Sequence, residues 1–349
     1  MIFFRIDLGH KHGLGHYNRI KSLIKYLNLK NYKIIIDKLS NISFLEKEKK
    51  NIISLYKRNN HFKNELEDAN LFLKIIKSKY KRPIVVKDSY RLSYNWEKYI
   101  YKHCKKVISI DDFLEKQHFV DVYINHGPCF SNDNEKFLKK LKYNNKKNCI
   151  FLLGPSYALF NSSYNKKEKV ISDFVFYNGG SGDLLVYEKI IKKLSNIKKK
   201  PFKIVLIIGP YTKNYKIIYS KFKSSKNIRI FHQPKNILNF LIGTKIFISS
   251  AGISMFESSF LKIPTLLFKM NDNQNLSDFD YENLGHYFTL EKQDLKSLDK
   301  VVNLTGLMLK NRVQIKKMMS KSIINTKNIK QNFQKYLKFW YEKICNFTN

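Results

Sequence analysis

Residues 1–19 read MIFFRIDLGHKHGLGHYNR, and this stretch decides the fold. An apolar, strand-forming run ends at Asp7, and a loop that contains Gly13 and Gly15 follows it. Residues 17–27 then place apolar side chains at helical spacing. A buried strand that leads through a glycine-containing loop into an amphipathic helix indicates the first unit of a parallel α/β sheet.

The same alternation recurs along the chain. Further apolar, β-branched runs in the first half lie at 32–37, 83–88, 106–111 and 121–125. A stretch near 150–165, strand-like at 149–154 and then rich in turn formers, is interpreted as the connection to a second series. That series has expected strands at 173–180, 202–209, 227–231, 245–252 and 263–268, with helices around 184–195, 235–242 and 254–262.

This pattern predicts an α/β protein of the GT-B type, in which two Rossmann-like domains with parallel sheets face a central cleft. We expect residues 1–160 to form an N-terminal Rossmann-like domain. Residues 161–349 would form a C-terminal Rossmann-like domain, in which a Lys-rich helical extension begins near residue 293.

Length and composition agree with two soluble domains, since 349 residues with 43% hydrophobic side chains suffice for two cores. No apolar run reaches the ~18 residues of a membrane span. Arg5 and Asp7 interrupt the N-terminal apolar run, which is therefore shorter than the apolar region of a signal peptide. Four scattered cysteines form no CxxC pair, which is typical of a reducing compartment: Cys104, Cys129, Cys149 and Cys345. We therefore expect a cytoplasmic protein, and a monomer.

The net charge of +37 raises the question of a nucleic-acid partner. Only seven of the 65 basic residues are Arg, although Arg is the favoured reader of phosphates and bases. Ala occurs three times, and the Lys residues are spread over the whole chain, as AT-rich codon usage produces. We interpret the charge as solvated surface without a specific nucleic-acid partner, and leave open a weak association with anionic membrane surfaces.

The loop after the first strand carries the residues that most resemble catalytic groups. His16 falls at the start of a helix, where the positive end of the dipole disfavours an imidazolium. A neutral imidazole can accept a proton at pH 7, as a general base must. Gly13 and Gly15 let the backbone turn tightly and approach a ligand. A single His is more often a satisfied or exposed residue, but the preceding glycines and Asp7 at the strand end favour the functional interpretation.

Three histidines in this loop, His10, His12 and His16, also permit a metal site with Asp7. No HExxH-type helix fixes the geometry of two of them, so we predict no metal. We also expect no cofactor.

Three loops of the second half are suited to a nucleotide. Adjacent glycines and a hydroxyl before a helix suit a diphosphate held by backbone N–H groups, and each such loop alone is also an ordinary turn. A carboxylate one helical turn in, Glu257, could accept the hydroxyls of a ribose, or be a surface residue favoured by the helix dipole. The candidate residues of these loops are Gly179, Gly180, Ser181, Ala251, Gly252, Ile253, Ser254, Glu257, Asn273 and Gln274.

Together these motifs resemble a known family. The pattern D-x-x-x-x-x-G-x-G-H-x-x-R, from Asp7 to Arg19, resembles the N-terminal signature of the UDP-sugar hydrolases of pseudaminic acid biosynthesis. Those enzymes act on UDP-2,4-diacetamido-2,4,6-trideoxy-β-L-altropyranose. Further similarities, in order, are Asp88-Ser-Tyr90, Ile110-Asp-Asp112, 154–159, Gly179-Gly-Ser181, 250–257 and Asn273-Gln274. The loops of the second half are shared more widely with MurG-like glycosyltransferases.

The resemblance implies metal-independent hydrolysis of a UDP-sugar at the anomeric carbon, with inversion. It implies that residues 1–160 form the sugar-binding and catalytic domain and that residues 161–349 form the UDP-binding domain. It implies that His16 is the catalytic histidine and that Asp7 and Tyr90 line the sugar pocket. Glu257 would bind the ribose, and Asn273 and Gln274 the diphosphate or the sugar. Arg19 belongs to the same N-terminal signature. The chain departs from the family in the extra residue of Gly-Gly-Ser-Gly-Asp183, in His10 and His12, and in the long C-terminal extension.

Other functions remain open at this point. The nearest alternative is a MurG-like glycosyltransferase of surface polysaccharide synthesis, which would use the same UDP loops with an acceptor in place of water. A basic binding protein for nucleic acid or membranes would bind no UDP. A non-hydrolysing UDP-HexNAc 2-epimerase would need more acidic residues around the sugar than the sequence offers.

Overall fold

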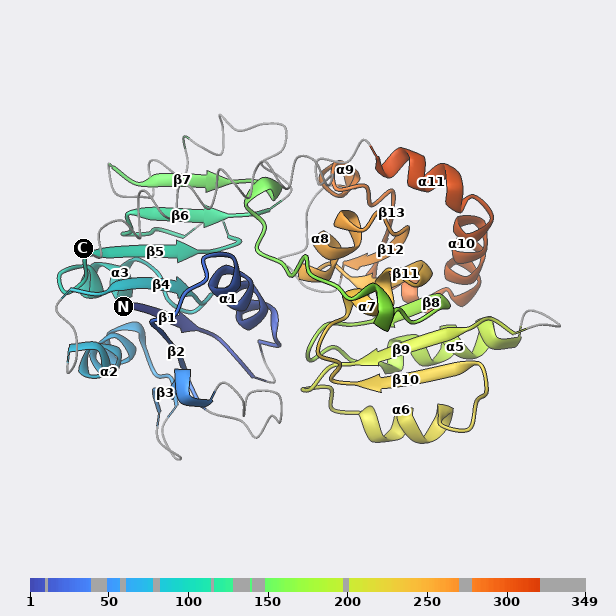
Figure 1. Cartoon of the computed structure of the whole chain (residues 1–349), viewed down its shortest axis with the longest axis horizontal. Helices are drawn as coiled ribbons and strands as arrows, with labels where there is room; N and C mark the ends of the chain where they lie inside the picture. The colour runs from blue at the N-terminus through green and yellow to red at the C-terminus, as the bar shows by residue number, and fades with distance from the viewer. Residues whose placement is uncertain are drawn as a thin grey trace. The chain divides into compact units, whose positions relative to one another are not determined.

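Two parallel β-sheets organise the chain in the computed structural model (Figure 1). The structure describes residues 1–9, 12–38, 49–56, 61–77, 82–113, 116–127, 139, 148–196, 201–269 and 278–320. Contacts divide these residues into two units. Unit 1 takes its described residues from Met1–His12 and His16–Leu159, and unit 2 takes its own from Gly13–Gly15 and Phe160–Asn328.

The sheet of unit 1 has seven strands in the order β3-β2-β1-β4-β5-β6-β7 within the described residues. Every neighbouring pair is parallel, so the carboxyl ends of the strands meet at one edge. The strands are β1 (Ile2–Ile6), β2 (Tyr32–Ile36), β3 (Ile52–Ser54), β4 (Ile84–Asp88), β5 (Lys106–Ile110), β6 (Val122–Asn125) and β7 (Ile150–Leu153). Their buried, β-branched sequences are typical of a sheet covered on both faces.

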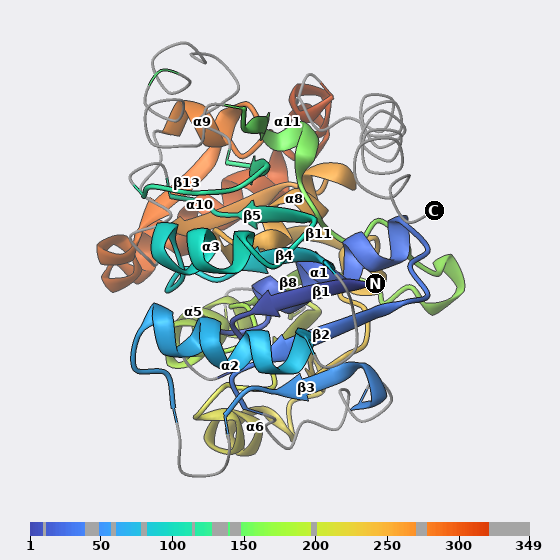
Figure 2. The ribbon, with the colours of Figure 1, turned by 90° about the vertical axis from the view of Figure 1, so that its left-hand side faces the viewer.

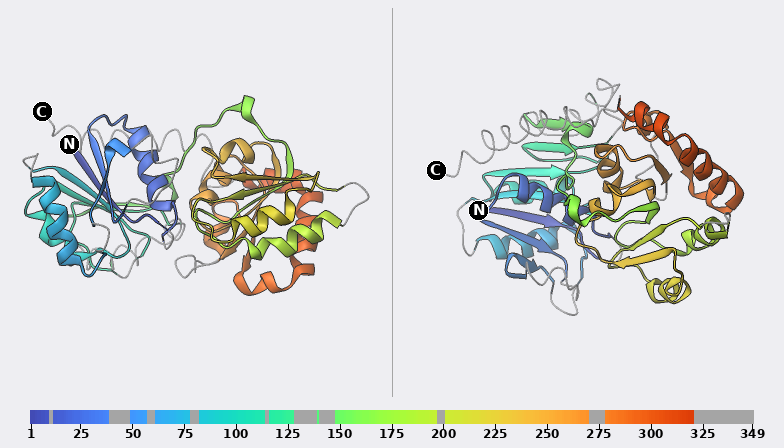
Figure 3. Two further views of the ribbon diagram at one scale, coloured as in Figure 1. Left: turned by 90° about the horizontal axis from the view of Figure 1, so that it is seen from below. Right: turned by 45° about the vertical axis from the view of Figure 1, so that its right-hand side comes forward.

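Helices cover both faces of this sheet. The helices are α1 (Gly15–Tyr26), α2 (Glu65–Lys77) and α3 (Tyr94–Tyr101). Phe72 of α2 and Trp96 of α3 pack with the odd-numbered residues of β1 and β4, such as Phe3 and Val85. Figure 2 shows α2 and α3 on the face toward the viewer, and the left panel of Figure 3 shows α1 on the opposite face. Because side chains alternate along a strand, successive residues at each strand end serve different faces.

Unit 2 has a six-stranded parallel sheet in the order β10-β9-β8-β11-β12-β13 among its described residues. Its strands are β8 (Ser172–Tyr177), β9 (Ile204–Ile208), β10 (Ile228–His232), β11 (Thr244–Ser250), β12 (Thr265–Lys269) and β13 (Phe288–Glu291). Its helices are α5 (Leu185–Asn196), α6 (Tyr215–Phe222), α7 (Leu238–Leu241), α8 (Ile253–Phe260), α9 (Asp278–Glu282), α10 (Leu298–Lys310) and α11 (Arg312–Met319). Helices α5, α6, α10 and α11 share one buried core, and α7 packs in another.

The parallel α/β architecture expected from the sequence is confirmed, with local differences. Residues 150–153 form the edge strand β7 of the first sheet, where Val122 pairs with Ile150, so the connection between the units is shorter than expected. The sequence analysis did not predict β3, α6 or β13. β3 and β13 have only three and four residues, too few for a periodic signal. In the described part of the chain, no helix has both the length and the apolar character needed to cross a membrane.

One buried ion-pair cluster ties β1 to α2 in unit 1. The guanidinium of Arg5, which is fully buried, donates through Nε to Asp68 Oδ1 at 3.1 Å and through Nη2 to Oδ2 at 2.5 Å. Asp68 also accepts from Trp96 Nε1 at 2.9 Å and from the Tyr56 hydroxyl at 3.0 Å. The carboxylate therefore joins a strand, two helices and the loop after β3.

We expect Asp68→Ala to destabilise unit 1 by about 3–5 kcal/mol, because it leaves the Arg5 charge buried with one fewer partner. Urea unfolding measures the loss. Glu67→Ala is the matched control on the same helix, since the partly exposed Glu67 side chain pairs with the exposed Lys63, and its effect should stay within about 0.5 kcal/mol. Equal effects of the two substitutions would contradict the role assigned to Asp68.

Candidate functional site

Polar side chains gather at the carboxyl-end edge of the unit 1 sheet. Asp7 follows β1, Asp88 ends β4, Asp112 follows β5 and His126 follows β6. Neighbouring parallel strands bring these ends together although up to 119 residues separate them in the chain. In open α/β sheets this edge is where ligands bind.

Arg19 of α1 is the centre of this group. Its side chain is 3% exposed, and its Nε and Nη2 donate to the two oxygens of Asp88 at 3.0 and 2.6 Å. Nη1 donates to both oxygens of Asp112 at 3.0 and 2.9 Å and lies 3.2 Å from His126 Nε2. One guanidinium thus links α1 to the ends of β4, β5 and β6.

His16 and Asp88 form a second contact of this group. His16 Nδ1 lies 2.6 Å from Asp88 Oδ1, and the imidazole side chain is 5% exposed. An ionised carboxylate only accepts hydrogen bonds, so this contact favours the neutral tautomer with the proton on Nδ1 and the lone pair on Nε2, and Arg19 Nη2 also lies 3.0 Å from Nδ1. Within the described residues no hydrogen-bond partner contacts Nε2. Although burial raises the pKa of Asp88, Arg19 and His16 hold it below its ordinary value.

Tyr90 and His126 complete the surroundings of Arg19. The Tyr90 hydroxyl donates to Asp112 Oδ2, and its ring makes an edge contact with His16 at 4.6 Å between centroids. Burial raises the pKa of Tyr90 well above its usual range, so the phenol is neutral. Burial lowers the pKa of His126 to about 4, so this imidazole is also neutral and can accept from Arg19.

Asp7 is engaged in a separate set of contacts. Its side chain is fully buried; one oxygen accepts from Ser89 at 2.9 Å and the other from Arg91 at 2.5 Å. Arg91 also pairs with Asp37 at 2.8 Å. Burial alone would raise the pKa of Asp7, but the Arg91 hydrogen bond lowers it to about 2. Asp7 is therefore an ionised carboxylate whose oxygens are both occupied.

The loop after β8 in unit 2 is built around its glycines. Gly179 has φ +69°, a conformation that favours glycine. A Cβ on Gly182 would lie 1.9 Å from the Asn178 carbonyl oxygen, so the residue that the sequence analysis regarded as extra allows the loop to close. Asn178 Nδ2 donates to the Asp183 carbonyl at 2.8 Å, and the Asp183 carboxylate accepts from the Leu185 N–H at the start of α5.

The second loop of unit 2 follows β11, the neighbour of β8 in the sheet. Gly252 is the N-cap residue of α8 and forms no side-chain cap. The hydroxyl groups of Ser249 and Ser254 form a hydrogen bond of 3.0 Å. Glu257 is 7% exposed, not a surface residue. Burial raises its pKa to about 8, because within the described residues no donor contacts its carboxyl group.

The structure brings some predicted site residues together and leaves others apart. His16, Arg19 and Tyr90 lie in one cluster, with Asp7 held nearby through Ser89 and Arg91. In unit 2, Gly179, Gly180 and Ser181 lie at the end of one strand, and Ala251, Gly252, Ile253, Ser254 and Glu257 at the end of its neighbour.

Other predicted residues gain less support or lie outside the described chain. Gly13 has φ +67°, whereas Gly15 begins α1 and an added Cβ there would meet nothing within 4 Å. Asn273, Gln274 and His10 lie outside the described residues. In the described part of the chain, no three His, Cys, Asp or Glu side chains are grouped as a metal site requires.

The sequence analysis assigned no role to Asp88, Asp112 or His126. The first two stood only in motifs, and His126 had no local signal. Strand-end position, which the predicted sheet provides, was the one feature from which all three could have been found.

Comparison with known proteins bears on the fold. No model of a known protein family matches the sequence. An uncharacterized protein of Methanocaldococcus jannaschii is 24% identical over 282 residues, which make up 77% of this chain and 55% of that protein. The chain thus spans about half the length of this relative.

Several solved structures match nearly the whole chain at low identity. MurG of Acinetobacter baumannii has a TM-score of 0.57 at 10% identity, covering 97% of this chain and 98% of its own. A UDP-glucosyltransferase from Polygonum tinctorium scores 0.62 at 10% identity with the same coverage. The UDP-GlcNAc 2-epimerase of Methanocaldococcus jannaschii, solved with UDP-GlcNAc and UDP, scores 0.55 at 16% identity, covering 88% and 93%. This chain has the GT-B fold. At such identities the likeness establishes the GT-B fold alone.

We expect Gly182→Ala to destabilise unit 2 by about 1–3 kcal/mol, because the new Cβ would overlap the backbone of Asn178. Gly306→Ala in α10 is the control: a Cβ there meets nothing within 4 Å, and the helix should gain about 0.5–1 kcal/mol. Thermal unfolding of both variants measures the two effects. A neutral Gly182→Ala would show that the loop closes differently.

The raised pKa of Glu257 predicts a pH dependence of stability. The folded protein holds this proton up to about pH 8, whereas the unfolded chain releases it near the ordinary value of 4.5. Between these values the unfolded state binds fewer protons, so stability falls by up to about 1.4 kcal/mol per pH unit and then levels off. Glu257→Gln removes this term. Denaturation of both proteins from pH 5 to 9 should show their stability difference changing up to about pH 8 and constant above it; parallel curves would contradict a neutral Glu257.

Proposed function

We propose that this protein hydrolyses a UDP-sugar at the anomeric carbon, without a metal, releasing UDP and an inverted free sugar. The observation that carries the proposal is the pairing of His16 Nδ1 with Asp88 at 2.6 Å on the ligand-binding edge of a GT-B unit. The sugar is of the 2,4-diacetamido-trideoxyhexose class, as the Asp7–Arg19 signature suggests, and the reaction serves nonulosonic acid or surface-glycan synthesis.

In the proposed reaction, a water oxygen attacks C1 of the sugar while His16 Nε2 takes a water proton. The bond between C1 and the β-phosphate oxygen breaks, and its electron pair leaves with UDP. Asp88 stabilises the imidazolium that forms, since it already accepts the Nδ1–H. Inversion follows from one direct displacement.

Unit 2 is proposed to bind the UDP. Backbone N–H groups of Gly179–Ser181 and of Gly252–Ser254 would hold the diphosphate at the starts of α5 and α8. The Glu257 carboxyl group has no donor among the described residues, so two ribose hydroxyls would supply the hydrogen bonds that it lacks.

Asp7 and Tyr90 receive positioning roles in this proposal. The Asp7 oxygens accept from Ser89 and Arg91, so we assign Asp7 the role of fixing the end of β1. Tyr90 orients Asp112 through its hydroxyl and the His16 ring through its edge contact.

Transfer to an acceptor is the second candidate function, because MurG and a UDP-glucosyltransferase share the fold. The base would then take its proton from an acceptor hydroxyl in place of water. UDP-sugars incubated with the protein alone separate the alternatives. Hydrolysis releases UDP and a free sugar whose first anomer, followed by NMR, is inverted. A transferase releases UDP only with an acceptor, and an epimerase gives a C2-epimeric UDP-sugar.

We expect His16→Ala to lower the turnover number by about 10²–10⁴-fold while UDP binding, measured by calorimetry, stays within threefold of the wild type. The loss follows from removal of the base, whereas the UDP loops lie in unit 2. His61→Ala, which removes an exposed histidine, is the control and should leave both quantities unchanged. An unchanged turnover in His16→Ala would remove this residue from the mechanism.

A further inference from the structure

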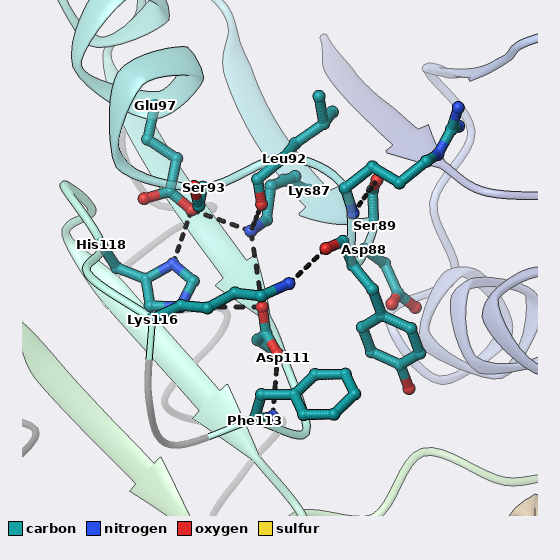
Figure 4. Close-up of polar contacts among 12 residues, drawn as sticks. Lys87, Asp88, Ser89, Leu92, Ser93, Glu97, Asp111, Phe113, Lys116 and His118 are labelled. Carbon is teal, nitrogen blue, oxygen red and sulfur yellow. Dashed lines mark hydrogen bonds and ion pairs between the residues drawn. The ribbon is translucent and has the colours of Figure 1, made fainter. Parts of the chain in front are cut away.

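A second buried polar cluster lies on the face of the unit 1 sheet opposite to Arg19. It consists of Lys87, Glu97, Asp111 and His118, all of them fully buried (Figure 4). Lys87 precedes Asp88 on β4, and Asp111 precedes Asp112 after β5. Because side chains alternate at strand ends, each pair of neighbours sends one residue to each face.

Glu97 of α3 is the ionised member of this cluster. Its carboxylate lies 2.9 Å from Lys87 Nζ and 2.8 Å from His118 Nδ1, and it accepts from the Phe119 N–H at 2.7 Å. Burial would raise the pKa of Glu97, but Lys87 and the other donors lower it to about 2. An ionised acceptor at this distance requires a proton on His118 Nδ1, so a neutral ring carries its lone pair on Nε2.

Asp111 has the opposite environment. Its Oδ1 accepts from the Phe113 N–H at 2.8 Å, but Oδ2 is buried without a hydrogen-bond partner in the described chain. His118 Nε2 is buried and equally without one, and the two atoms lie 3.6 Å apart. Lys87 Nζ lies 3.9 Å from Oδ2, too far for a hydrogen bond. If Asp111 Oδ2 and His118 Nε2 are both acceptors, neither has a hydrogen bond. A single proton shared between these two atoms gives both of them one.

We propose that Asp111 is a neutral carboxylic acid in the folded protein, that its Oδ2–H is directed to His118 Nε2, and that this pair positions Asp112 for the candidate active site. The two atoms lie 3.6 Å apart, just beyond hydrogen-bonding distance, so the proposed bond requires a small rotation of the carboxyl group. The cluster is then electrically neutral, because the charges of Lys87 and Glu97 cancel and the other two groups carry none. Loss of the proton would leave a net negative charge without solvent.

The other groups around Asp111 agree with this assignment. Besides Lys87, Glu97 and His118, the facing groups are Lys116, whose ammonium donates to the Tyr90 carbonyl, and Tyr123, whose hydroxyl donates to the Phe113 carbonyl at 2.8 Å. Neither group donates to Asp111 Oδ2 in the described chain. Burial raises the pKa of Asp111, and the nearby cations lower it by less.

The positioning role follows from where the segment after β5 is held. His118 and the Phe119 N–H fasten the end of this segment to Glu97 of α3, and Asp111 fastens its beginning through Phe113. Asp112 lies in this segment and accepts from Arg19 and Tyr90. This part of the inference rests on the proposed function, because positioning matters only if Arg19 and His16 act in catalysis.

Nitrogen NMR of the whole protein, labelled with ¹⁵N-histidine, tests the proton directly. The His118 signals are identified by their absence in His118→Gln. At pH 7 we expect a neutral ring with a protonated Nδ1 and an unprotonated, hydrogen-bonded Nε2. In Asp111→Ala the Nε2 signal should shift as its hydrogen bond is lost. A doubly protonated ring, or an Nε2–H tautomer, would overturn the proposal, since the proton would then not lie on Asp111.

The same chemical change in two adjacent residues gives the second test. An Asn at 111 can still accept from the Phe113 N–H and donate to His118, so Asp111→Asn should shift the thermal midpoint by less than about 3 °C. Asp112→Asn removes a charge that Arg19 needs and should lower the midpoint by about 6 °C or more. Comparable losses in the two variants would overturn the neutral assignment.

Turnover separates the positioning role from the proton. Asp111→Ala should lower kcat by about 10–100-fold with little change in KM, and Asp111→Asn should restore most of it. A wild type without activity on any UDP-sugar would sink the proposed function, while NMR and the thermal pair still decide the state of Asp111. An active enzyme in which Asp111→Ala keeps full kcat would overturn the positioning role alone.

Discussion

The structure of the candidate site depends on the burial of the Arg19 charge. A guanidinium without solvent is tolerated only with anionic partners in good geometry, and Asp88 and Asp112 provide four such contacts. These contacts fix α1 against the ends of β4 and β5 at once. The orientation of His16 follows, since it lies one turn from Arg19 on α1 and shares the Asp88 carboxylate. The histidine is thus held by the same ion pairs that hold the sheet edge.

Strand alternation explains why adjacent residues at this edge have opposite electrostatic states. Asp112 faces Arg19, which holds its pKa well below the usual range although burial acts in the other direction. Asp111, one residue earlier, faces the α3 side, where Glu97 already takes the nearest donors of Lys87 and His118. The distribution of donors therefore helps to decide which carboxyl group is charged, and burial acts in the same direction, since Asp111 is fully buried whereas the Asp112 side chain is 19% exposed.

The parallel sheets and the loop after β1 could be predicted from the sequence, because the patterns that indicate strands, helices and glycine-containing loops are local. His16 and Arg19 share one sequence motif, and the family resemblance alone assigned Tyr90 to the same site. From the sequence, Asp88 received no role. This carboxylate lies 72 residues from His16 in the chain, and the two meet only because β1 and β4 are neighbours in the sheet. The burial of Glu257 was not predictable either, since its helix position suits an exposed carboxylate equally well. The role of Gly182 required the positions of the Asn178 atoms.

Among the described residues, Asp111 and Glu257 are buried carboxyl groups that lack the donors needed to hold them ionised, and their surroundings differ. Beside Asp111 an imidazole nitrogen lies within 3.6 Å, so the acid can be satisfied inside the protein and has a structural use. Glu257 has no such neighbour among the described residues, and its burial is the whole cause of its raised pKa. A buried polar group without a partner is costly in the free protein, and a ligand that donates hydrogen bonds removes this cost on binding. Those donors stabilise the ionised form, so a diol bound at Glu257 would cause the Glu257 carboxyl group to lose its proton. Below about pH 8 this ionisation costs free energy and would weaken the binding of the diol. The two acids thus follow from one physical rule, and Glu257, which has no internal partner in the described chain, is the one that we propose to bind a ligand.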